Sequence, residues 1–260
     1  IAWAAKKMGG PVPEPDPRFA MLPPDDRWSL ANQADTQVRE NQVQFRSALE
    51  TITTSAPIAI QNTGNYSGTL PGPDAFEAAY GPQEGAARYS TFTTGVETAK
   101  QVHAMQTMAP TEIQSILAAA RPTSSGDDAV LETRRYEALQ SAAEQTIKAR
   151  EADPAGYARS AFPNVNQAWN GATQPGGYQA AIAASVAAQE FLGVENIQPL
   201  PKDTAARAVE SFKNEQLPEG ARIASVANVL MATPDPSQRR ALFNQLVDAG
   251  LPDITEGAFR

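Results

Sequence analysis

Helical periodicity is the feature that most constrains the fold of this 260-residue chain. From about residue 26 onward, apolar residues recur at spacings of three and four, which is typical of amphipathic helices. Proline stands near the start of several of these segments and glycine follows the end of others, as helix termini favour. We therefore predict an all-α fold, a multi-helix bundle of about ten helices. The expected helices span 26–54, 73–80, 83–108, 110–121, 127–152, 176–192, 202–216, 218–232 and 236–249, with two short ones between 153 and 172.

The proline distribution predicts the domain organisation. Six prolines fall within residues 9–27, and proline removes a backbone donor and disfavours helix in the residue before it. We expect an extended arm or linker over 1–25, followed by two packed helical subdomains at 26–172 and 173–260. Between the first two helices, 57–61 and 66–70 could form a short hairpin, and an irregular loop is an equally good interpretation.

The helix expected at 26–54 carries a heptad stripe. We predict that the stripe is buried within the chain, with Val38 and Phe45 as its main anchors, because it is short and rich in alanine. The alternative is an oligomer seam, in which the amide of Asn41 would fix the register. The stripe consists of Ala31, Ala34, Val38, Asn41, Phe45, Ala48 and Ile52.

Composition excludes several classes of function. The net charge is −8, whereas binding to nucleic acid without sequence preference needs a basic face. The chain has no cysteine, which excludes disulfides, thiol catalysis and zinc–thiolate sites. No apolar run is long enough to span a membrane. We expect no cofactor, no sequence-specific nucleic acid and no transmembrane segment. The first residues, IAWAAKKMGG, do not resemble a signal peptide and suggest a piece of a longer chain or a processed product.

Two residues are weak catalytic candidates. Glu210-Ser211, followed by Gly220-Ala221, resembles the start of the catalytic region of lytic transglycosylases, where a glutamate acts as general acid. In that family a second glycine and Leu-Met-Gln follow, whereas here Arg222 comes next. Helical neighbours of Glu210 are cationic, which opposes the raised pKa that a general acid needs. We interpret Glu210 as a surface glutamate.

The single histidine, His103, continues an apolar helical stripe that begins at Tyr89. We interpret it as a half-buried, hydrogen-bonded side chain. Asp127 and Asp128 stand at a helix start and are better explained as capping residues than as metal ligands. We therefore expect no catalytic, cofactor-binding or metal site in this chain.

Three long segments, 74–92, 108–158 and 178–212, resemble the helical region of very large tailed-phage virion proteins, which often carry a lytic transglycosylase domain elsewhere. The resemblance implies a non-enzymatic structural segment of a virion protein, which could be ejected with the genome. Its partners would be other virion proteins or other domains of the same parent chain. One alternative is a peptidoglycan-binding or transglycosylase-associated domain. Another is a bacterial helical interaction module, located in the cytoplasm or periplasm. The oligomeric state is left open.

Overall fold

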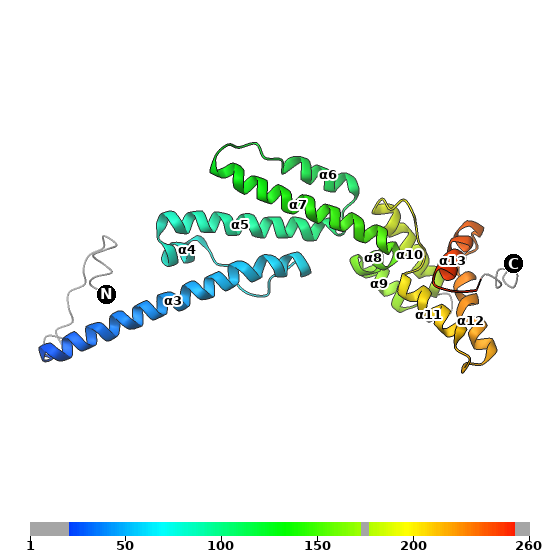
Figure 1. The fold of residues 1–260 in the computed structure, drawn as a ribbon, viewed down its shortest axis with the longest axis horizontal. Coiled ribbons are helices and arrows are strands. Elements are labelled where there is room, and N and C mark those ends of the chain that lie inside the picture. The colour runs from blue at the N-terminus through cyan, green and yellow to red at the C-terminus, as the bar shows by residue number, and fades with distance from the viewer. Residues whose placement is uncertain (1–20, 173–176, 253–260) are drawn as a thin grey trace. The chain divides into compact units, whose positions relative to one another are not determined.

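The computed structural model describes residues 21–172 and 177–252, and this part of the chain is all-helical, as predicted (Figure 1). Eleven helices follow one another along the described residues, and no strand occurs among them. The helices are α3 (Pro24–Thr63), α4 (Pro73–Tyr80), α5 (Pro82–Met105), α6 (Pro110–Ala119), α7 (Asp127–Ala152), α8 (Pro154–Ala161), α9 (Pro163–Asn170), α10 (Gly177–Phe191), α11 (Lys202–Lys213), α12 (Glu219–Leu230) and α13 (Pro236–Asp248).

Proline marks where most of these helices begin. It occupies the first position of α3, α4, α5, α6, α8, α9 and α13. The first helical N–H has no partner within the helix and the proline φ angle suits the helix, so proline costs little there. The carboxylates of Asp153 and Asp235 accept hydrogen bonds from the backbone N–H groups of Gly156 and Ser237, which caps α8 and α13. Helix α7 begins at Asp127, as expected, with Gly126 as its N-cap.

Helix α3 is longer than predicted, because it continues through Pro57 to Thr63. Residues 57–61 are therefore helical, and neither the hairpin nor a loop forms there. A proline inside a helix removes one hydrogen bond. Burial offsets this cost, since Ala56 and Ile60 on either side of Pro57 are buried. The chain leaves the helix at Gly64, whose φ of 78° is a left-handed conformation that glycine adopts readily.

The chain divides into two compact units, Ile1–Ala56 with Gly68–Phe92, and Pro57–Ser67 with Thr93–Arg260. The core of the first unit is an aromatic group on α4 and α5. The ring of Phe76 lies 5.5 Å from that of Tyr89 and 5.6 Å from that of Phe92, measured between centroids. Such edge and tilted arrangements stabilise aromatic pairs beyond their burial.

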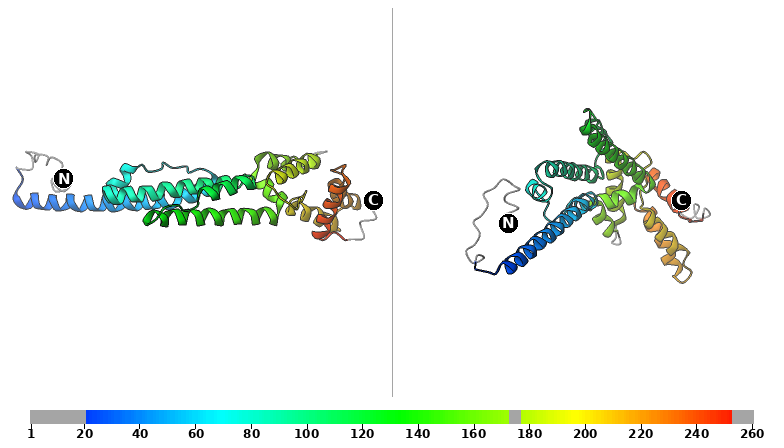
Figure 2. Two further views of the ribbon diagram at one scale, coloured as in Figure 1. Left: turned by 90° about the horizontal axis from the view of Figure 1, so that it is seen from above. Right: turned by 60° about the vertical axis from the view of Figure 1, so that its left-hand side comes forward.

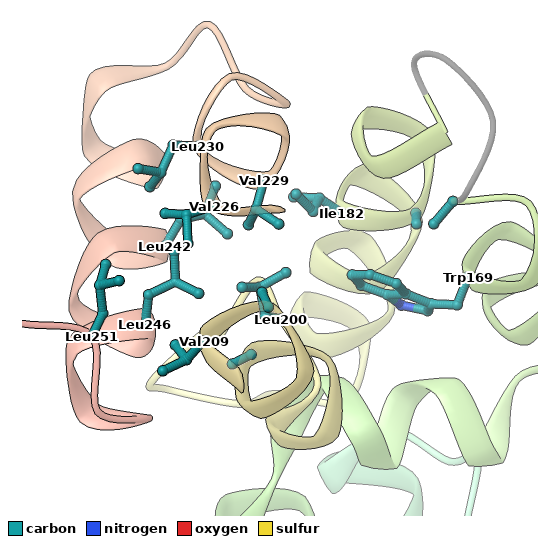
Figure 3. Close-up of a cluster of buried hydrophobic side chains, with 14 of the residues drawn as sticks. Trp169, Ile182, Leu200, Val209, Val226, Val229, Leu230, Leu242, Leu246 and Leu251 are labelled. Atoms are coloured by element: carbon teal, nitrogen blue, oxygen red, sulfur yellow. The ribbon is translucent and has the colours of Figure 1, made fainter. Parts of the chain in front are cut away.

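The second unit holds two apolar clusters. The smaller one joins the end of α5 to α6 and α7 through Met105, Ile113 and Leu139. The larger one, shown in Figure 3, gathers side chains from the α8–α13 helices that point toward one another. The subdomain boundary expected at 172/173 falls inside the larger cluster, because Trp169 on one side and Ile182 on the other both belong to it.

The prediction that Val38 and Phe45 anchor a buried stripe is wrong. Val38 is 42% exposed and Phe45 44% exposed, and every described residue from Asp25 to Ala48 is exposed. The physical reason is the length of the neighbouring helices. Helix α4 contacts α3 near Arg46, whose Nε donates to the carbonyl of Ala79 at 2.7 Å. Figure 1 and the left view of Figure 2 show that neither α4 nor α5 lies beside the N-terminal part of α3.

The predicted arm lies largely outside the described residues. Residues 1–20 are not described, and α3 already includes Pro24 and Asp25.

Candidate functional site

Glu210 lies on the outer face of α11 and is exposed. Its neighbours on the inner face, Ala208 and Val209, are buried in the larger apolar cluster. Arg207 forms its ion pair with Asp203, at 2.9 Å, and not with Glu210. A glycosidic general acid needs an apolar pocket that keeps it protonated near neutral pH. The position of Glu210 offers none.

His103 lies on α5 against the end of α3. It is half-buried, and its Nδ1 lies 3.2 Å from the carbonyl oxygen of Gln61. The ring also fills the space beside Gly64, where a Cβ atom would come within 2.6 Å of Nε2. The histidine therefore packs the α3–α5 contact, as its place in the apolar stripe predicts.

A recess of about 450 Å³ lies in the second unit, between α6, α7 and the segment that follows α10. Ile113, Leu117, Ala143 and Leu192 line its apolar part. Glu151 and Glu195 also line it, and both are exposed. A recess with this lining could bind an apolar side chain or ligand. It lacks the buried, paired acid and base that a catalytic centre requires.

Arg150 contributes to the wall of the recess and is only 3% exposed. Its guanidinium donates to the carbonyl oxygens of Met105 and Met108 at 2.8 Å and of Leu192 at 3.2 Å. These carbonyls belong to or follow the last turns of α5 and α10, where the helix dipole is negative. Among the described residues no carboxylate pairs with Arg150, so the helix ends supply the compensating negative charge.

Two glutamines hold the segment after α10 in place. The buried side-chain amide of Gln189 pairs with both the N–H and the C=O of Gln198, at 2.9 and 3.0 Å. The amide of Gln245 pairs in the same way with Leu200, with both distances 3.0 Å. Each side-chain amide thus satisfies both backbone groups of one residue, as a paired β-strand would do in a sheet. These bonds hold Gln198 and Leu200, which follow shortly after the residues 192–196 that line the recess.

The most distinctive surface is the exposed stripe of α3, which we call the free face. It consists of Ala31, Ala34, Val38, Asn41, Phe45 and Ala48. Four residues after Phe45 the same side of the helix carries Leu49, which is 3% exposed, and Ala56 follows seven residues later, fully buried. The free face is therefore the continuation of a core-forming stripe beyond the helices that cover it.

The sequence did not reveal Arg150, Gln189 or Gln245 as organising residues. An arginine or glutamine on an amphipathic helix carries no local signal of burial, since its partners are 9 to 45 residues away in the chain.

None of the helices among the described residues combines the length and hydropathy needed to cross a bilayer. Within those same residues, no group of three or more acidic, histidine or cysteine side chains is arranged to hold a metal ion.

No protein-family model matches the chain, and comparisons with curated proteins and with solved structures found no match either.

Proposed function

We propose that this chain is a non-enzymatic helical interaction segment of a large phage or prophage virion protein. The main support for an interaction role is the exposure of the free face of α3. Helices in proteins gain most of their stability by packing an amphipathic face, and the apolar stripe of this stretch is exposed and available to a partner. The resemblance of segments 74–92, 108–158 and 178–212 supports the virion setting.

The exposed position of Glu210 argues against the lytic alternative. The carboxylate has no apolar surroundings that would keep it protonated, and the sequence lacks the glycine and Leu-Met-Gln that follow in transglycosylases. The partners on this proposal are other virion proteins or other domains of the parent chain.

Particle composition tests the virion setting. Virions purified by density gradient from an induced culture of the source strain should contain peptides of this chain by mass spectrometry, in constant ratio to a capsid protein. A host cytoplasmic protein followed through the same gradient serves as the control. Peptides found only in the cell fraction would contradict the proposal.

Incubation with purified peptidoglycan tests the alternative. The chain should remain in the supernatant and leave the turbidity of the suspension unchanged. Clearing that disappears in Glu210→Gln would establish the lytic alternative instead.

A further inference from the structure

We infer that the free face of α3 pairs with the free face of a second copy of this chain, with the two helices antiparallel. The inference rests on the proposed interaction role of α3 and adds the identity of its partner. It follows from three features of the stretch between Pro24 and Ala48, namely its extent, the sizes of its side chains and its charges.

The extent of the free stretch sets the register. It begins at Pro24, where the helix starts, and ends at Ala48, one residue before the buried Leu49. At about 1.5 Å per residue it is roughly 36 Å long, enough for about three heptads. Two such stretches overlap fully in an antiparallel pair only when the helix start of one copy lies beside Ala48 of the other.

The side chains of the free face fit one another in this register. Ala34 lies opposite Val38 of the second copy, and Ala31 lies opposite Asn41. Both of these layers pair an alanine with a larger residue, which lets the two helices approach evenly there. The spacing of the stripe is thus compatible with the register that the extent of the free stretch sets.

The parallel arrangement fits less well. It would place Phe45 against Phe45, Ala31 against Ala31 and the Arg27 guanidinium groups against each other. In the antiparallel arrangement Arg27 instead lies opposite the ring of Phe45 of the second copy, where a cation–π contact is favourable.

Charge supports the same orientation. The first half of the free stretch carries three aspartates and one arginine, and the second half carries two arginines and one glutamate. An antiparallel pair places the acidic half of each copy beside the basic half of the other, and it also opposes the two helix dipoles. The charged residues are Asp25, Asp26, Arg27 and Asp35, then Arg39, Glu40 and Arg46.

Two matched valines provide the test of the surface. Val38 lies on the free face, whereas Val43, which is 67% exposed, lies about 140° around the helix from it. Analytical ultracentrifugation of the full chain should show a monomer–dimer equilibrium. Val38→Asp should raise the dimer dissociation constant at least about tenfold, and Val43→Asp should leave it within about twofold. Equal effects of the two substitutions, or a chain that stays monomeric at the highest attainable concentration, would overturn the inference.

The absence of native cysteine allows the orientation to be tested directly. Oxidation of an equimolar mixture of Ala34→Cys and Val38→Cys chains should give a disulfide-linked heterodimer, while either variant alone should link poorly. Efficient linking of each variant with itself would show a parallel pair and overturn the antiparallel arrangement. Self-association is measured on the purified chain and virion incorporation on particles, so either proposal can fail without the other.

Discussion

At the scale of single residues, we expect removal of the Arg150 guanidinium to destabilise the protein strongly. Arg150→Ala leaves the carbonyls of Met105, Met108 and Leu192 without this donor, and the arginine that binds them is only 3% exposed. We expect a loss of about 3–5 kcal/mol in the free energy of unfolding, measured by urea denaturation. The control is Arg134→Ala on the exposed side of the same helix, which should cost less than about 0.5 kcal/mol. Equal losses in both variants would contradict the buried role.

Glu132 should make folding sensitive to acid. Its carboxylate accepts a hydrogen bond from the Ser124 hydroxyl at 2.6 Å and from the N–H groups of Thr123 and Ser124 at 2.8 and 3.0 Å. These bonds lower the pKa of Glu132 from its usual value, and the bond from the Ser124 hydroxyl contributes most. A lowered folded-state pKa stabilises the protein above the unfolded pKa of about 4.3, and this contribution is lost as the pH falls through the folded value.

The pH dependence of a substitution provides the measurement. Glu132→Gln should unfold at lower urea concentration than the parent at pH 7, and the difference should shrink as the pH falls below about 4. Glu137→Gln, at an exposed position on the same helix, controls for the change in net charge. A difference that is constant from pH 7 to pH 3 would show that the carboxylate charge does not hold the 123–124 segment.

At the scale of elements, the segment after α10 depends on its two glutamines. Gln245→Ala removes the partners of both backbone groups of Leu200, which is fully buried. We expect a loss of about 2–4 kcal/mol and faster hydrogen exchange in a peptide covering residues 193–201. The matched substitution is Asn244→Ala, at the exposed neighbouring position, which should change neither quantity appreciably. Unchanged exchange in Gln245→Ala would mean that other contacts fix the segment.

Local signals predicted the helices well, and contacts between distant residues account for what they missed. Proline near the helix start marked α6 and α13 because such terminal signals depend on neighbours along the chain. The continuation of α3 through Pro57 was missed because burial of Ala56 and Ile60 outweighs the local preference of proline. The stripe of Val38 and Phe45 was found, yet its exposure depends on where α4 and α5 end in space. Arg150 was missed because the carbonyls that it binds lie far from it in the chain.

At the scale of the whole molecule, the free stretch and the two compact units should respond differently to dilution. The units hold buried cores of their own, with Phe76 in the first and Leu242 and Leu246 in the second. Their unfolding depends mainly on contacts within one chain. The residues from Pro24 to Ala48 have no buried side chain among those described, so in the proposed dimer their helix is stabilised by packing against the second copy.

Thermal unfolding followed by circular dichroism at 222 nm, over a hundredfold range of protein concentration, should therefore show two components. A minor loss of ellipticity, on the order of a tenth of the helical signal, should move to lower temperature on dilution, because dissociation releases the free stretch. The major transition should stay nearly fixed. Val38→Asp should remove the concentration dependence of the minor component, and Val43→Asp should retain it. If the minor component stays at the same temperature on dilution, α3 is stable without the second copy. If no part of the melting curve depends on concentration, the free face does not pair with a second copy and contacts only its own chain.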